Sequence, residues 1–255
     1  MSTVAISKTE HGWVATAGPG QVGEVRVRLR PDDRCLVWFA PDSSPSAIAD
    51  LFAAVVSAHP QDLITEVPDT DATLLANLTA AGFVERRREH VYEVDGEAAL
   101  AALADQNIGL EWTILTAEQV DRDRLRESDD LLRQDTPGVS GWRWNREDFL
   151  AEMAPPAFDP QLYRVLVDES GEYQGICRIW PNPQRPRIGF VGVTRRHRRT
   201  GLATAPLADT LRAARRAGLS TLTLEADVEN VSNRLAAKIG ARRVGGTVEL
   251  VHRRG

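Results

Sequence analysis

The chain has 255 residues, of which 42% are hydrophobic and 26% charged, and this composition is typical of a globular protein with one large or two small domains. Its formal net charge of −5 argues against nucleic acid as a partner and suits a cationic substrate at least as well. No apolar run approaches the roughly 20 residues of a membrane-spanning helix, and polar residues follow Met1. We therefore expect a cytoplasmic protein with no membrane partner.

The two cysteines, Cys35 and Cys177, lie far apart in apolar, strand-like runs. This pattern predicts reduced thiols in the core, and neither a disulfide nor a metal site.

The first half predicts an alternation of strands and helices. Short β-branched runs bounded by Gly, Pro and Asp mark strands, and apolar residues at helical spacing mark helices. The expected strands are residues 4–6, 13–17, 24–30, 35–40, 63–67 and 85–94. The expected helices are residues 46–58 with Ser46 as N-cap, 71–81 closed by Gly82, and a connector at 98–104.

The second half opens with a strand at residues 112–115 and a helix over 116–134, which the capping-box pattern from Thr116 to Gln119 would begin. A turn-rich loop with two tryptophans follows. The remaining strands are expected at residues 162–167, 173–180, 190–193, 221–225 and 248–251. The remaining helices are expected at residues 201–216, kinked by Pro206, and at residues 230–239.

The stretch from Phe190 to Ala205 has the features of an anion site. An apolar run predicts a buried strand, and the helix after it leaves its first N–H groups without internal partners. Gly201 would let the backbone approach an anion closely, and Arg198 and Arg199 add positive charge. Neither a Walker loop nor a dinucleotide-binding turn is present. The stretch therefore predicts a phosphate-binding loop, with a solvated basic turn as the alternative.

The segment Arg198-Arg199-Thr200-Gly201-Leu202-Ala203, after Val191-Gly192-Val193, resembles the acyl-CoA loop of the GNAT N-acetyltransferase family, R/Q-x-x-G-x-G/A after a Val-x-Val strand. The resemblance covers residues from about 110 to 252 and, more weakly, the first half. It implies an α/β (α+β) fold in which each domain has a mixed, mostly antiparallel twisted sheet flanked by helices. It also implies acetyl-CoA as co-substrate, held between two splayed central strands.

The resemblance assigns cofactor contacts residue by residue. The strand would bind the pantetheine arm, and the loop would bind the pyrophosphate. The implied cofactor-binding residues are Val191, Gly192, Val193, Arg198, Arg199, Thr200, Gly201, Leu202, Ala203, Thr204 and Asn230. Asn230 also suits the alternative role of a helix N-cap.

The order of elements in the second half repeats that of the first. Leu63-Ile64-Thr65-Glu66 aligns with Leu222-Thr223-Leu224-Glu225, each before a helix and a closing glycine. The turn at residues 38–45 has neither arginine nor glycine, so the first copy has lost the phosphate site. We expect a degenerate GNAT-like domain at residues 1–105 and a catalytic GNAT domain at residues 106–255.

Two departures from the family pattern affect the predicted chemistry. Arg195 replaces the usual proline after the Val-x-Val strand, and Ala236 stands where the family commonly has a tyrosine as general acid. Ser232 is a candidate for that role, or else a hydroxyl at a helix start. Glu225 is the preferred general base because it closes the strand beside the cofactor gap. Asp227 and Glu229 are alternatives, as is a purely surface role for all three.

The acceptor would bind near the tryptophan loop. Trp142 and Trp144 are candidate substrate-binding residues, with packing between the halves as the alternative. The preferred function is acetyl transfer from acetyl-CoA to a primary amine of a small molecule, by direct attack in a ternary complex. The alternatives are a protein or peptide N-acetyltransferase and a non-catalytic acyl-CoA-binding module. The sequence pattern does not indicate which acceptor, acyl chain or oligomeric state the protein has.

Overall fold

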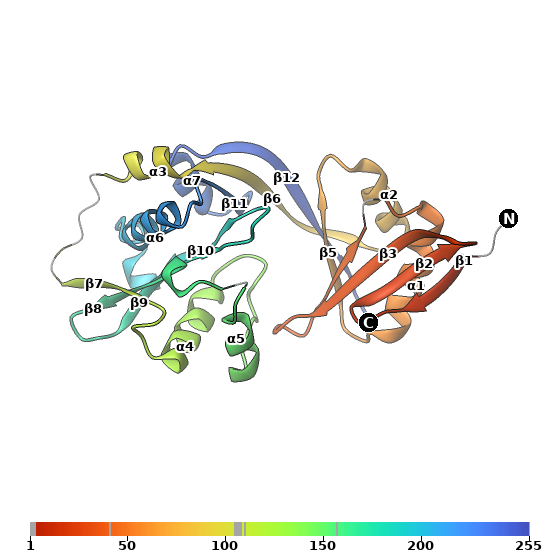
Figure 1. Ribbon diagram of the computed structural model, residues 1–255, viewed down its shortest axis with the longest axis horizontal. Helices are drawn as coiled ribbons and strands as arrows, with labels where there is room; N and C mark the ends of the chain where they lie inside the picture. Colours follow the sequence, from red (N-terminus) through yellow and green to blue (C-terminus); the bar gives the residue numbers. More distant parts are fainter. Residues whose placement is uncertain (1–3, 41, 105–108, 110, 157, 255) are drawn as a thin grey trace. The chain divides into compact units, whose positions relative to one another are not determined.

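The computed structural model describes residues 4–40, 42–104, 109, 111–156 and 158–254, and it divides into two compact units (Figure 1). Unit 1 comprises Met1–Glu89 with Gly245–Gly255, and unit 2 comprises His90–Val244. The mixed, mostly antiparallel α/β class expected from the sequence is confirmed, since the strands pair antiparallel except at one parallel pair in each unit. Within the described residues, no helix is both long and apolar enough to cross a bilayer.

Unit 1 is a six-strand sheet with two helices packed on one core. The strand order is β1-β2-β3-β4-β5-β12. The elements are β1 (Val4–Lys8), β2 (Gly12–Ala17), β3 (Gly20–Leu29), β4 (Cys35–Phe39), α1 (Pro45–Ala58), β5 (Leu63–Pro68), α2 (Ala72–Ala80) and most of β12 (Arg242–His252). Leu51 of α1 and Leu78 of α2 are fully buried in the same cluster as Leu250 of β12.

Unit 2 contains the other six strands of the 12-strand order, with helices on both faces. Their order is β6-β11-β10-β9-β8-β7. The elements are the part of β6 (Val84–Asp95) from His90 onward, α3 (Gly96–Ala102), β7 (Trp112–Thr116), α4 (Arg122–Arg133), α5 (Arg146–Glu152), β8 (Tyr163–Asp168), β9 (Tyr173–Trp180), β10 (Arg187–Val193), α6 (Thr204–Arg216), β11 (Thr221–Asp227) and α7 (Ser232–Lys238). Successive residues of β9 separate the two cores: Ile176 packs with α4 and α5, and Cys177 packs with α3, α6 and α7.

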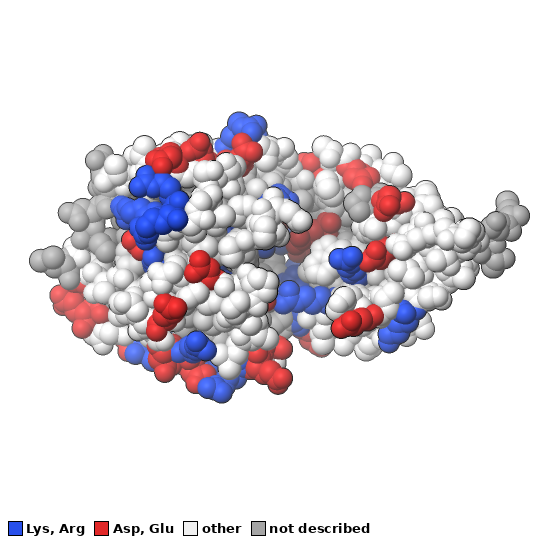
Figure 2. Space-filling view, viewed as in Figure 1, with Lys and Arg blue, Asp and Glu red and all other residues white. Residues whose placement is uncertain are grey.

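The outer face of α6 is basic. Arg212, Arg215 and Arg216 are exposed, as the helical periodicity predicts, and Figure 2 shows basic side chains gathered over the position that α6 occupies in Figure 1. Arg215 donates to the Glu97 carboxylate of α3 at 3.0 Å. This part of the surface is therefore a solvated helix face with local ion pairs.

The two halves of the chain repeat one topology. A four-strand meander leads through a helix to a parallel fifth strand, and a second helix then leads to a sixth strand. The parallel pairing is equally short in both copies, Cys35 and Leu36 against Leu63 and Ile64 in unit 1, and Arg187 and Ile188 against Thr223 and Leu224 in unit 2. The second copy alone carries two helices, α4 and α5, between its first two strands.

The sixth strands are exchanged between the two copies. Residues Thr247–His252 of β12, which follow α7, pair antiparallel with β5 from Pro68 to Leu63. The strand that follows α2, β6, lies next to β11 in the strand order. The compact units therefore have limits at residues 89 and 245. The domain boundary expected between residues 105 and 106 lies outside the described residues.

Two expected helix starts were wrong, each because a nearby residue caps better. Ser44, not Ser46, caps α1 and accepts from the Ala47 N–H at 3.2 Å. Thr116 ends β7 and a turn follows it, not a helix, although its N–H does reach the Gln119 side chain at 2.9 Å. The helix starts after Asp121, whose carboxylate accepts from Arg124 N–H.

Two further helix predictions need correction. Helix α6 begins at Thr204, so Pro206 lies in its first turn, where its missing N–H has no intrahelical partner to lose and the reason for a kink disappears. Helix α5 was not predicted at all, because its seven residues are too few for a clear apolar period. Its N-cap, Asn145, accepts from Asp148 N–H at 2.7 Å.

Both cysteines should be unreactive in the folded protein. Burial raises the pKa of Cys35 to about 11 and that of Cys177 to about 12. A thiol with a pKa near 11 is roughly one part in a thousand thiolate at about pH 8, and the thiolate is the nucleophile. We expect a maleimide to label neither residue in the native protein and both after unfolding in guanidinium. Rapid native labelling of either thiol would contradict this description of the core.

Candidate active site

The central strands of unit 2 diverge at one point. β10 and β11 pair only at Arg187 and Ile188, whereas the pairing of β10 with β9 continues to Val193. An irregularity in the β9 register lies between Ile188 and Phe190. Gly189 occupies this bulge, and a Cβ there would lie 1.9 Å from the Trp180 ring, so only glycine fits. The expected strand Val191-Gly192-Val193 therefore flanks an opening between β10 and β11.

The loop from β10 to α6 presents several free backbone donors. Arg199 and Gly201 have φ values of 65° and 87°, and the Thr200 hydroxyl donates to His197 O at 2.7 Å. Among the described residues, no hydrogen bond uses the N–H groups of Arg199, Thr200, Gly201 or Ala203. Such converging N–H groups before a helix form a site for an anion. The predicted role of this loop in binding phosphate stays a prediction.

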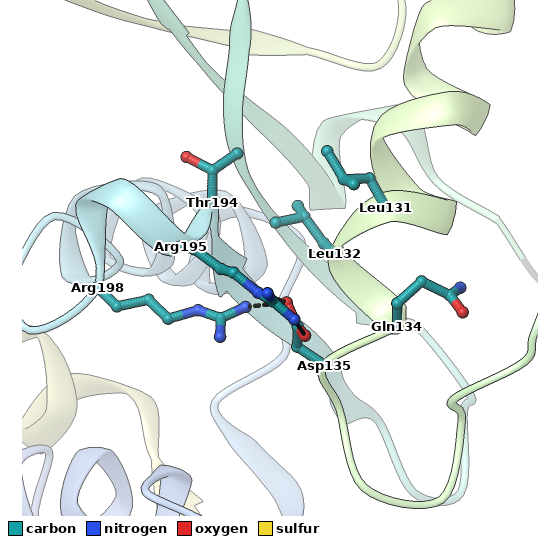
Figure 3. Close-up of a pocket in the computed structure, with 7 residues that line it drawn as sticks. All are labelled: Leu131, Leu132, Gln134, Asp135, Thr194, Arg195 and Arg198. Atoms are coloured by element: carbon teal, nitrogen blue, oxygen red, sulfur yellow. Dashed lines mark hydrogen bonds and ion pairs between the residues drawn. The ribbon is translucent and has the colours of Figure 1, made fainter.

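A pocket of about 410 Å³ lies where this loop faces the end of α4. Figure 3 shows its lining residues, which are Leu131, Leu132, Gln134, Asp135, Thr194, Arg195 and Arg198. Asp135 accepts from Arg195 Nε at 2.9 Å and from Arg198 Nη2 at 2.8 Å. Hydrogen bonds from these two guanidinium groups hold the pKa of Asp135 well below its usual range. Arg199 is exposed and has no ion pair within the described part of the chain.

Glu225 directly follows the last β11 residue that pairs with β10. Its carboxylate accepts from Arg187 and lies 3.6 Å from Arg185 Nη2. Sequence reasoning placed Glu225 at this position but missed both arginines. Asp227 instead accepts from Glu229 N–H at 2.9 Å, and Glu229 is exposed. Of these three carboxylates, Glu225 lies at the divergence of the strands.

The comparisons with known proteins agree with this geometry. Residues 125–241 match the model described as the acetyltransferase (GNAT) family. This segment belongs to the GNAT family. A search of curated proteins finds no match to the chain.

Solved structures extend the likeness to both halves. A GCN5-related N-acetyltransferase from Sphaerobacter thermophilus superposes with a TM-score of 0.72 at 18% identity, over 96% of this chain and 81% of that one. A tandem GNAT protein from the clavulanic acid biosynthesis pathway superposes with a TM-score of 0.70 at 15% identity, over 95% and 82% of the two chains. A GCN5-related N-acetyltransferase from Kribbella flavida has a TM-score of 0.59 at 12% identity, over 97% and 90%. The chain thus has the fold of two GNAT-like domains.

The turn between β11 and α7 is held by asparagines. Asn230 Oδ1 accepts from Ser232 N–H at 3.1 Å, a hydrogen bond within the turn. Asn230 is not the N-cap of α7, because Val231 holds that position and makes no side-chain cap bond. Asn233, which sequence analysis did not single out, donates to Asp227 O and Asn230 O at 2.8 and 2.9 Å and accepts from the Tyr92 hydroxyl at 2.9 Å. Ser232 is half-buried at the start of α7.

The position of the usual GNAT tyrosine is an apolar core position here. Ala236 on α7 is fully buried in the cluster that contains Leu224 and Ile239. Its methyl group has no proton to give. Ala236 therefore cannot act as a general acid.

The two tryptophans of the α4–α5 loop have different environments. Trp144 is 5% exposed, and its indole N–H donates to Asp129 at 2.9 Å. Trp142 is half-buried, packs edge-on against Trp144 with ring centroids 5.0 Å apart, and stacks on Arg133. Trp144 is thus a core residue, and of the two indole rings only that of Trp142 is partly exposed to solvent.

A buried ionic cluster supports this loop and was not foreseen from the sequence. Asp129 is 1% exposed and accepts from Arg133, from Trp144 and, at 2.9 Å, from the Tyr163 hydroxyl. Burial alone would raise the pKa of Asp129, but the Arg133 charge and these donors lower it overall. The spacing of Asp129 and Arg133, four residues apart on α4, was the available signal.

Proposed function

We propose that this protein transfers the acetyl group of acetyl-CoA to a primary amine of a small molecule, by direct attack in a ternary complex. The observation that carries the proposal is the loop before α6, where four free N–H groups and the exposed Arg199 lie beside the opening between β10 and β11. Residues 106–255 contain this site. In the first copy, Ser44 N–H and Ala40 N–H are tied back to β3, so residues 1–105 would act as a non-catalytic partner domain.

The donor set fits a CoA molecule. Main-chain N–H groups and guanidinium groups suit a diphosphate, which carries negative charge and many acceptor oxygens. The backbone of Val191, Gly192 and Val193 would hold the pantetheine arm. The pyrophosphate would bind the loop residues Arg198, Arg199, Thr200, Gly201, Leu202, Ala203 and Thr204. Asn230, in the turn that follows β11, would add a further contact to the cofactor. Holding amine and thioester together would supply most of the rate.

Glu225 would accept the proton that the amine loses as its nitrogen attacks the thioester carbonyl. The amine nitrogen forms the new amide bond, the carbon–sulfur bond breaks, and the thiolate takes up a proton. Ser232 is our candidate for the group that protonates or positions this thiolate. Glu225 must first leave at least one of its arginines, since Arg187 and Arg185 now occupy its oxygens.

Two alternatives have specific support. A protein or peptide acceptor would use the partly exposed Trp142, with Trp144 behind it, as an apolar contact. A non-catalytic acyl-CoA-binding module is favoured by Ala236 and by the ion pairs of Glu225. Thiol release from acetyl-CoA, measured with panels of amines and peptides, separates the three. Turnover with small amines supports our proposal, turnover with peptides alone supports the second, and CoA binding without turnover supports the third.

The proposed base gives a prediction with a pH signature. Replacing Glu225 by Gln should lower kcat/KM by roughly 10²–10⁴ near pH 7, because the amine is mostly protonated there. The deficit should shrink toward pH 10, where a growing share of the amine is neutral without help. Pre-steady-state or initial-rate measurements across pH provide the test.

Glu229→Gln is the matched control, since it removes an exposed carboxylate from the same turn. It should keep the activity of the parent protein. The assignment reverses if Glu229→Gln is the impaired variant and Glu225→Gln is not.

A further inference from the structure

Asp135 holds two of the arginines that surround the phosphate loop. Arg195 grips its carboxylate with two nitrogens, through Nε at 2.9 Å and through Nη2, and Arg198 adds a third hydrogen bond at 2.8 Å. The carboxylate is 19% exposed and lies at the edge of the 410 Å³ pocket (Figure 3). A carboxylate therefore already occupies part of the guanidinium surface that an incoming phosphate would use.

The chain that carries Asp135 is fixed by its neighbour. Gln134 Nε2 donates to Asp130 O at 2.8 Å and to Trp142 O at 2.9 Å, and its Oε1 accepts from Gly141 N–H at 3.1 Å. These three bonds cross-link the end of α4 to the loop that follows it. The backbone at Asp135 is therefore fixed in place, and the side chains of Arg195 and Arg198 extend to its carboxylate.

We infer that Asp135 is an internal competitor for the phosphate groups of acyl-CoA, which occupies Arg198 in the free protein and gives it up when a diphosphate binds. The inference rests on the proposed function, because it assumes that CoA binds at this loop. A phosphate can displace the carboxylate because it carries more negative charge and can take both prongs of a guanidinium. Competition of this kind lowers the affinity for CoA, and it would speed release of the CoA product.

Asp135→Asn tests the competition directly. The amide keeps the shape of the side chain but loses its charge, so CoA should bind about tenfold more tightly, as expected for removing one like charge near a surface anion site. Pantetheine, which lacks the diphosphate, should bind the parent and the variant equally. Isothermal titration calorimetry with both ligands at fixed salt gives the two affinities, and thermal unfolding checks that the fold is kept.

Asp168→Asn is the matched control, because Asp168 pairs with the neighbouring loop residue Arg196 at 3.1 Å without lining the pocket. It should leave the affinity for CoA unchanged. An equal gain in both variants would mean that any lost negative charge helps, and would overturn the inference.

The pair Asp135 and Arg198 can be isolated with a double-mutant cycle. In a protein that already carries Arg198→Gln, the gain from Asp135→Asn should be smaller, since only the Arg195 guanidinium remains to be released. An unchanged or weaker CoA affinity for Asp135→Asn, or the same gain in both backgrounds, overturns the inference while leaving the proposed function intact. A parent protein that binds no CoA overturns both.

Discussion

The double substitution Arg199→Glu with Gly201→Asp is expected to abolish CoA binding and to leave the fold intact. It replaces one positive charge by a negative one and adds another negative charge among N–H groups that would face a diphosphate. Each like charge near such a site weakens binding about tenfold or more, so the combined loss should exceed about a hundredfold. Calorimetric titration with CoA measures this loss, and far-ultraviolet circular dichroism follows the fold.

Backbone strain must be separated from charge in this experiment. Gly201 has a φ of 87°, where any side chain costs about 1 kcal/mol. Gly171 provides the control, since it has a φ of 80° in the β8–β9 turn with open space around it. Gly171→Asp should show the same small loss of stability and normal CoA affinity. If the double variant still bound CoA like the parent, the site would have to lie elsewhere.

Removing the Asp129 carboxylate should destabilise unit 2 more than any surface substitution on the same helix. Asp129→Ala leaves the buried Arg133 without its counter-ion and the Tyr163 and Trp144 donors without their acceptor. Breaking a buried ion pair in this way costs about 3–5 kcal/mol. Urea unfolding followed by tryptophan fluorescence reports the change.

Asp123→Ala is the control for this stability prediction. Asp123 is on the same helix and pairs with Arg146 at 3.0 Å, but both side chains are more than half exposed. Its removal should cost less than about 1 kcal/mol. Similar losses for the two variants would show that the Asp129 cluster does not hold the unit together.

The same cluster gives the protein an acid-sensitive term in its stability. Because the pKa of Asp129 is lower folded than unfolded, its contribution is present above the unfolded value of about 3.9 and is lost as the pH falls toward the folded value. The Asp129→Ala variant should lack this term. Its stability should therefore depend less on pH below about pH 4 than that of the parent protein.

Local patterns in the sequence located most elements and the loop before α6, because these depend on neighbours along the chain. Gly201 and the Val191–Val193 strand predicted the loop, since a positive φ and a β-branched run are properties of a few residues. The same is true of α2, whose cap Asp71 and closing Gly82 frame it. The predicted helix starts were wrong where two possible N-cap residues lie within a few positions of each other.

Features that depend on strand register were not accessible to the same reasoning. Glu225 and Arg187 are 38 residues apart and meet only because β10 and β11 pair at Thr223 and Arg187. Asp129 was overlooked because a carboxylate four residues before an arginine is usually an exposed pair on a helix surface. Burial turns such a surface pair into a structural ion pair, and here the burial of Asp129 follows from the packing of Tyr163 and Trp144. The sequence carried no sign that β12 would join β5.

The exchange of sixth strands has a consequence for the order in which the protein folds during synthesis. The sheet that starts with Val4 is completed by residues Thr247–His252, so Leu63 gains its partner His252 only after the intervening residues have been synthesised. The amino-terminal half must remain with an open sheet edge while the second half is made. A nascent chain stalled before residue 245 should thus be open to proteases at β5, even though β5 itself has long been translated.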